Sequence, residues 1–317
     1  MKTAVISPKV IILTSCASRK RASGKPLIWR KPGPEVALRD VADAWARTIA
    51  SASALCKAED MYLGRSFSEA KQACRTAEAT MYIVSAGLGL VAGQELIPAY
   101  DLTMASGPTS LTPILKRLGN DPSDWWHILH TARGRRDPIY SLLTQYPQAV
   151  VLLAMPADYI ALISAELATL SPAHIKQLRI LTSTFGQSFV PEQLRNNVLA
   201  YDERLEGSAY AGTRTDFPQR ALRHFVDVLQ GHRLSLDDAH DKVSKAMAEL
   251  VQPRIPSRAK KTDDEIIALL KRNWLIHDGR AGKLLRFLRD DALVACEQAR
   301  FQGLWKLVKQ SLEQEYV

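Results

Sequence analysis

The chain has 317 residues, of which 46% are hydrophobic and 24% are charged, and its formal net charge is +9. This composition is typical of a folded globular protein and excludes a disordered chain. The sequence contains no run of eighteen apolar residues and no signal-peptide pattern at its start, so neither a membrane partner nor secretion is expected. We therefore expect a cytoplasmic protein.

The basic residues are concentrated at the two ends of the chain. Residues 1–40 carry nine Lys and Arg against two acids, and residues 253–317 carry thirteen against nine. Clustered basic charge of this kind indicates a polyanionic partner, most often nucleic acid, although solubility alone is the alternative explanation. The charge thus indicates a nucleic acid, and we expect this partner to be DNA, in double-stranded form.

The cysteines and histidines do not have the spacing of metal ligands. Four cysteines, at positions 16, 56, 74 and 296, include no Cys-x-x-Cys pair, and the seven histidines form no His-x-x-x-His pair. Neither a zinc site nor a disulfide framework is indicated, and no cofactor is expected.

In the first 230 residues, apolar runs typical of buried strands alternate with helical patterns. Strands are predicted at Val10–Thr14, Met81–Ser85, Ala149–Met155 and Leu178–Ser183, and helices at 35–58, 66–77, 123–129, 157–168, 192–205 and 216–229. Strands separated by helices predict an α/β fold with a mostly parallel sheet covered by helices on both faces, which makes three layers.

The sequence changes character near residue 250. Residues 252–261 form a basic segment interrupted by prolines, which is typical of a linker. Thr262 and Glu265 then have the spacing of a capping box. Helices are predicted at 263–273, 279–289 and 293–314. We therefore expect an α/β catalytic domain over 1–250 and a small basic helical DNA-binding module over 253–317.

Polar and small residues follow the first two predicted strands, and aromatic residues lie in the segment between those strands. Parallel strands end at the same edge of a sheet, where ligands bind. Residues at this expected edge are Ser15, Cys16, Ser18, Lys20, Tyr62, Phe67, Ser85, Gly87, Gly89, Tyr100 and Asp101.

The pattern resembles a group of proteins that includes the peroxide-stress YaaA-like proteins and the catalytic core of archaeosine synthase. The resemblance rests on Ser15-Cys16 with Lys20, on Tyr62-x-Gly64-x-x-Phe67, and above all on Ser85-Ala86-Gly87-x-Gly89 followed by Tyr100-Asp101, and it covers about residues 8–225. It implies a sheet similar to the uracil-DNA glycosylase fold. Archaeosine synthase has a proline where Ser15 stands here, so lysine transfer is less expected.

Asp101 is the first candidate for the chemistry. A carboxylate beneath a sugar can stabilise the oxocarbenium-like transition state of N-glycosidic cleavage and orient water. The alternative is that Asp101 caps the segment after it. Cys16, as a nucleophile or a packed thiol, and Ser85 complete the candidate catalytic residues.

Other residues are candidates for binding substrate or DNA. Ser15, Ser18 and Lys20 can donate hydrogen bonds to a phosphate or a base edge, and Tyr100 lies beside Asp101 in the same motif. Tyr62 can stack on an extruded base, as can Phe67, although both could equally pack in the core.

Backbone and charge patterns add further candidates. Gly87 and Gly89 let the backbone approach a ligand, or make a tight turn. The small residues here predict a pocket with room for a base carrying an added group. Arg214 and Asp216 are expected to pair across that pocket.

These observations favour a DNA glycosylase that excises a modified base, such as glucosylated hydroxymethylcytosine, in defence against phages. A transferase that builds a hypermodified base, as archaeosine synthase does, is one alternative. A non-enzymatic DNA-binding protein resembling the YaaA-like group is the other.

Overall fold

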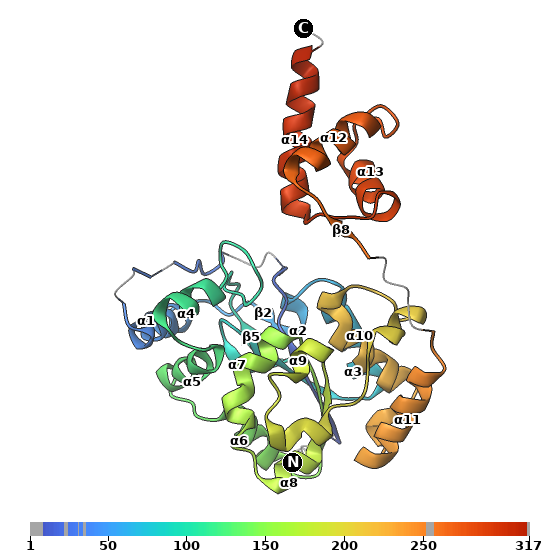
Figure 1. Cartoon of the computed structure of the whole chain (residues 1–317). Coiled ribbons are helices and arrows are strands. Elements are labelled where there is room, and N and C mark those ends of the chain that lie inside the picture. Colours follow the sequence, from blue (N-terminus) through green and yellow to red (C-terminus); the bar gives the residue numbers. More distant parts are fainter. Residues whose placement is uncertain (1–8, 22–24, 31, 34–35, 252–256, 316–317) are drawn as a thin grey trace. The chain divides into compact units, whose positions relative to one another are not determined.

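The computed structural model describes residues 9–21, 25–30, 32–33, 36–251 and 257–315. The chain divides into two compact units, Met1–Gln252 and Pro253–Val317 (Figure 1). Part of the expected linker, residues 252–256, lies outside the described residues.

The first unit is built on a five-stranded sheet with the order β4-β3-β1-β6-β7. The strands are β1 (Val10–Ser15), β3 (Thr80–Ser85), β4 (Gly89–Ala92), β6 (Val150–Ala154) and β7 (Leu178–Leu181). All neighbours pair in parallel except β3 and β4, which form an antiparallel hairpin. The predicted α/β fold with a mostly parallel sheet is confirmed.

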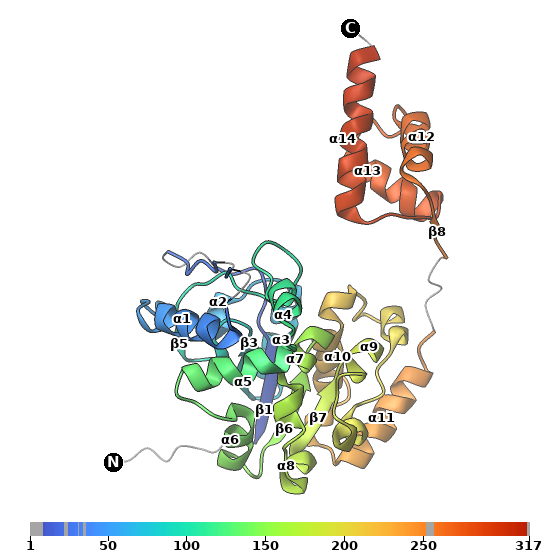
Figure 2. The same cartoon turned by 60° about the vertical axis from the view of Figure 1, so that its left-hand side comes forward.

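The sheet is covered on both faces. All six residues of β1 are buried, as expected for an apolar strand in the middle of a parallel sheet. Helices α3 (Arg65–Thr76) and α10 (Phe217–Asp227) pack against each other and against the strands. On the other side α5 (Pro122–Ala132) packs between α1 (Leu38–Ala50) and α7 (Ala157–Leu167). Strands β1, β6 and β7 run side by side (Figure 2).

The α-helices of the first unit are α1 (Leu38–Ala50), α2 (Ala58–Met61), α3 (Arg65–Thr76), α4 (Thr112–Leu118), α5 (Pro122–Ala132), α6 (Pro138–Gln145), α7 (Ala157–Leu167), α8 (Pro172–Gln177), α9 (Thr184–Gln187), α10 (Phe217–Asp227) and α11 (Leu236–Ala248). The predicted helix over 35–58 is wrong in its second half, because the chain after α1 forms β2 (Cys56–Lys57), which pairs with β5 (Leu96–Ile97).

The helix predicted over 192–205 is also wrong. This segment forms two 3-10 turns, Glu192–Asn197 and Glu203–Gly207. Between them Val198 bridges to Ile180 of β7, so the backbone there extends the sheet instead of continuing a helix.

The second unit has its own hydrophobic core. Its elements are β8 (Ala259–Lys260), α12 (Asp263–Asn273), α13 (Ala281–Arg286), a π-helical turn (Phe287–Asp291), β9 (Val294–Ala295) and α14 (Gln298–Glu315). Ile266, Leu284 and Phe301 are fully buried at its centre. The capping box of Thr262 and Glu265 is confirmed. Among the described residues, no helix is long and apolar enough to cross a membrane.

Candidate active site

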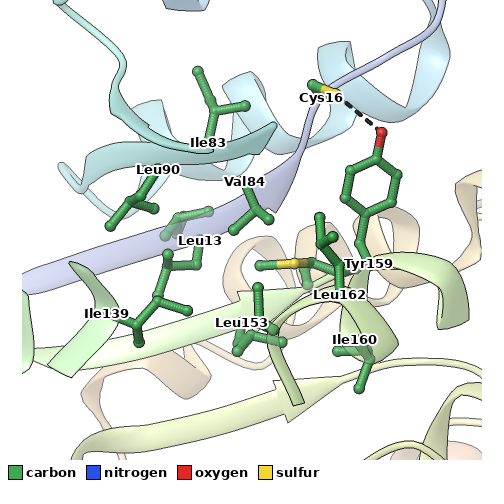
Figure 3. Close-up of a cluster of buried hydrophobic side chains, with 14 of the residues drawn as sticks. Leu13, Cys16, Ile83, Val84, Leu90, Ile139, Leu153, Tyr159, Ile160 and Leu162 are labelled. Atoms are coloured by element: carbon green, nitrogen blue, oxygen red, sulfur yellow. Dashed lines mark hydrogen bonds between the residues drawn. The ribbon is translucent and has the colours of Figure 1, made fainter. Parts of the chain in front are cut away.

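The candidate site lies where the strand order of the sheet reverses. From β1 the chain passes to β3 on one side, and it later crosses to β6 on the other. Open α/β sheets bind ligands outside the carboxyl ends of the strands at such a point. Cys16 follows β1 here, and its Sγ lies 3.0 Å from the hydroxyl of Tyr159, at the start of α7 (Figure 3).

Five side chains at this edge are buried, and the half-buried Lys20 brings its buried amine next to them. The five, Cys16, Tyr62, Ser85, Tyr100 and Tyr159, are each at most 5% exposed. We call these six residues the tyrosine–lysine cluster. Five of the six are residues that the sequence singled out. Tyr159 was not among the predicted site residues. The signal that could have indicated it is the apolar run that ends at Met155-Pro156, because a strand end is predicted just before Tyr159.

Three hydroxyls of the cluster form a hydrogen-bond chain with a defined direction. Ser85 Oγ accepts from the backbone N–H groups of Gly87, at 3.2 Å, and Leu88, at 2.9 Å. With both lone pairs occupied, Ser85 donates to Tyr100 Oη at 2.6 Å. Tyr100 in turn donates to Tyr62 Oη at 2.8 Å. The hydrogen of Tyr62 is thereby left for a group that enters the site.

The tyrosines of the cluster are neutral hydroxyls. Burial raises the pKa of Tyr62, of Tyr100 and of Tyr159 well above the usual value, because the phenolate form loses its hydration. These hydroxyls can therefore donate and accept hydrogen bonds, but they do not supply a phenolate at neutral pH. The hydroxyl of Ser85 takes part in three hydrogen bonds, which fix its position.

Lys20 brings an amine into this cluster. Its Nζ is buried and has no hydrogen-bond partner among the described residues, and it lies 4.3 Å from the ring centroid of Tyr100. Burial lowers the pKa of Lys20, although the charges of Cys16 and Asp101 oppose this shift. Lys20 therefore has a larger neutral fraction than a free lysine at the same pH.

Asp101 ties two loops together beside the cluster. Its Oδ1 accepts a hydrogen bond from the backbone N–H of Trp29 at 2.6 Å, and its own N–H donates to the carbonyl of Leu27 at 3.2 Å. The carboxylate thus caps an earlier segment of the chain, and not the one that follows it. Its Oδ2 takes no hydrogen bond within the described part of the chain, so this oxygen remains available.

The space beside the two glycines of the loop is filled by protein side chains. A Cβ on Gly87 would lie 2.6 Å from the ring of Tyr100. Gly89 has a φ of +73°, and a Cβ there would collide with the ring of His130. The prediction that small residues leave room for a bulky base is therefore wrong at this rim, because Tyr100 and His130 occupy that room.

The remaining candidates lie apart from the cluster or pack beside it. Phe67 is 1% exposed and its ring lies 5.2 Å from that of Tyr62, so it supports Tyr62 from within the core. Ser15 is buried and accepts a hydrogen bond from Gln219 Nε2 at 3.4 Å. Ser18 is exposed.

The expected pair of Arg214 and Asp216 does not form. Arg214 is exposed, whereas Asp216 is buried and accepts from Arg220 Nε at 2.6 Å. Arg220 has no exposed side-chain surface and also bonds Glu206 at 2.7 Å. Asp216 pairs with Arg220 instead of Arg214 because Asp216 and Arg220 are four residues apart and face each other at the start of α10.

His130 was not predicted, and it holds the turn that carries the site. Its Nε2 accepts a hydrogen bond from the backbone N–H of Leu90 at 3.2 Å. Burial lowers the pKa of His130 to about 3, so its imidazole is neutral at physiological pH.

We expect this buried histidine to destabilise the fold in acid. Between pH 6.5 and about 3 the unfolded chain binds a proton that folded His130 does not, so the free energy of unfolding falls by up to about 1.4 kcal/mol per pH unit as the pH decreases. His130→Gln retains an acceptor for Leu90 but does not titrate. Urea unfolding from pH 7 to pH 4 should show a smaller loss of unfolding free energy for this variant than for the wild-type protein. Equal losses in the two proteins would mean that another group causes the acid sensitivity.

The second unit carries a basic pocket of about 720 Å³. The cations that line it are Arg258, Lys260, Lys261, Arg289 and Arg300. Three of them have carboxylate partners: Asp290 for Arg258, Glu265 for Lys261 and Asp263 for Arg300. Lys260 has no partner within the described ranges, and Arg289 bonds only the carbonyl of Cys296. Where residues are described, no group of three or more His, Cys, Asp or Glu could hold a metal ion.

Comparison with known families matches part of the chain. Residues 48–111 match the model of a family of unknown function, DUF6884. No curated protein and no solved structure matches the chain. The matched segment contains Tyr62, Ser85, Tyr100 and Asp101, whereas Cys16, Lys20 and Tyr159 lie outside it.

Proposed function

We propose that this protein is a DNA glycosylase, which cleaves the N-glycosidic bond of a modified base and leaves an abasic site. The observation that carries the proposal is the place of Asp101, which directly follows Tyr100 of the buried hydroxyl chain. Its Oδ1 is fixed by the N–H of Trp29 at 2.6 Å, while its Oδ2 takes no hydrogen bond within the described residues. A carboxylate and neutral hydroxyl donors are the groups that this reaction uses.

Different residues act on the sugar and on the departing base. The carboxylate of Asp101 stabilises the positive charge that develops on the sugar as the bond breaks, and it orients water. The free hydrogen of Tyr62, at the end of the Ser85–Tyr100–Tyr62 chain, donates to the departing base, which gains electron density. Burial strengthens both interactions because little water competes.

Because the cluster is buried, a base must leave the duplex to reach it. A base within a stacked helix cannot reach side chains that are at most 5% exposed, and enzymes that act on bases extrude them at a cost of a few kcal/mol. Phosphate contacts offset that cost. The exposed Ser18 and Arg19, which precede Lys20, are suited to such contacts. A mostly parallel α/β sheet is compatible with a uracil-DNA glycosylase-like fold.

The test uses duplexes that differ in a single base. Labelled DNA with cytosine, uracil or glucosylated hydroxymethylcytosine is incubated with the full chain, heated in alkali and resolved by length. Strand breaks at the modified base, with the free base found by mass spectrometry, are expected. A gain of mass on intact DNA would favour the transferase instead, and a mobility shift without chemistry would favour a binding protein. A role in phage defence further requires activity on phage DNA that carries the modification.

We expect the basic pocket of the second unit to bind DNA phosphates. Replacing both Lys260 and Lys261 with alanine should weaken DNA binding and lower the slope of log Kd against log salt by about 0.9 for each lost contact. Fluorescence anisotropy at several salt concentrations measures this slope. Lys242→Ala with Lys245→Ala, on the exposed face of α11, is the matched control. An equal change in both pairs would mean that the effect is one of net charge.

A further inference from the structure

The amine of Lys20 is the reactive group that the proposed function leaves unused. Buried polar atoms in folded proteins nearly always have a hydrogen-bond partner, because desolvation without one is costly. Lys20 Nζ is buried without a partner in the described part of the structure. Such a group requires a reason other than stability.

A purely structural role does not account for the position of this amine. The ring of Tyr100, 4.3 Å from Nζ, attracts a cation through its face, but it satisfies none of the hydrogen bonds of an ammonium group. The backbone of Lys20 is fixed independently, by a bridge to Tyr62 and by the hydrogen bond from Leu63 N–H to the carbonyl of Arg19 at 2.9 Å. The lysine is therefore not needed to hold its loop in place.

We propose that Lys20 is a catalytic nucleophile that forms a Schiff base with C1′ of the deoxyribose, so that the protein cleaves the DNA strand at the abasic sugar as well as releasing the base. This inference rests on the proposed function. It is supported by the neutral fraction that burial gives the amine, since only the unprotonated form has the lone pair for attack. Asp101, which follows Tyr100 in the chain, stabilises the sugar during the attack.

The steps balance as follows. The lone pair of Nζ forms a bond to C1′ while the bond from C1′ to the base breaks, and the proton lost from Nζ ends on the base. The bond from C1′ to O4′ then opens, O4′ takes up a proton from water, and a protonated imine joins C1′ to Nζ. Water then takes a proton from C2′, the electron pair of that C–H bond forms a double bond between C2′ and C3′, and the bond from C3′ to the 3′-phosphate breaks, which cuts the strand. Water finally hydrolyses the imine and restores the amine.

Reductive trapping tests this inference with a probe that needs no base release. The full chain is incubated with an oligonucleotide carrying a 2-deoxyribose abasic site, and borohydride reduces any imine to a stable amine link. We expect a covalent adduct that mass spectrometry locates on Lys20. Lys20→Ala should lose it, and Lys20→Arg should lose it while keeping the positive charge. Lys25→Ala, which removes an exposed lysine nearby, should keep it.

The outcomes separate the inference from the proposed function. Base release from the modified duplex without a Lys20 adduct would overturn the inference and leave the glycosylase proposal standing. An adduct on Lys20 without base release from any duplex would support the nucleophile and overturn the glycosylase. An adduct on another amine, or one that survives in Lys20→Ala, would also overturn the inference.

Discussion

Replacing Asp101 with asparagine is expected to slow base release by at least about 100-fold, on the order of 3 kcal/mol in the barrier. Asparagine keeps an oxygen that can accept the hydrogen bond from Trp29, now at 2.6 Å, so the link between the two loops should survive. The variant lacks the negative charge that stabilises the developing cation on the sugar. The loss should therefore appear in the chemical step and not in folding.

Single-turnover base release from the modified duplex measures this step, and anisotropy measures DNA affinity separately. Affinity should change little, because the carboxylate does not attract phosphates. Asp241→Asn, an exposed carboxylate of α11, is the matched control and should behave as the unchanged protein does. A wild-type rate in Asp101→Asn would remove Asp101 from the mechanism and leave it only the structural link to Trp29.

The sequence predicted the part of the site that follows from strand ends. Buried strands appear as apolar runs, and parallel strands end at one edge, so the residues after them were expected to meet. The structure brings together Cys16, Lys20, Tyr62, Ser85 and Tyr100, and the hydrogen bonds between them connect segments up to 38 residues apart. Local patterns were sufficient for Cys16, which follows β1, and for Ser85, which ends β3, because these two strands are neighbours.

Contacts that depend on strand order could not be predicted. Tyr159 meets Cys16 across 143 positions of the chain only because β6 lies beside β1 and not beside β3, and hydropathy does not encode that choice. The role of Gly89 could not be predicted for a similar reason. Its positive φ fits a tight turn, but the ring of His130 that fills the space beside it comes from α5.

The burial and the charged contacts of Arg220 could not be predicted from the sequence either. In sequence it is one of 42 basic residues, and nothing marks it as buried. In the structure its guanidinium joins Asp216 and Glu206 and donates to the carbonyls of Tyr210 and Thr213, at 2.6 and 2.7 Å. A buried charge is tolerated only when such partners satisfy it.

We therefore expect Arg220→Met to lower the free energy of unfolding by about 3–5 kcal/mol. Methionine fills much of the volume, but the buried carboxylate of Asp216 keeps only the N–H of Thr213, at 2.9 Å, and a distant pairing with Arg65, at 3.9 Å, and two carbonyls lose their donor. Urea unfolding monitored by tryptophan fluorescence measures the loss. Arg214→Ala is the control, since that side chain is exposed and its removal should change stability by less than about 0.5 kcal/mol. Similar losses in the two variants would show that the contacts of Arg220 contribute little, and that the loop before α10 is held by its apolar residues alone.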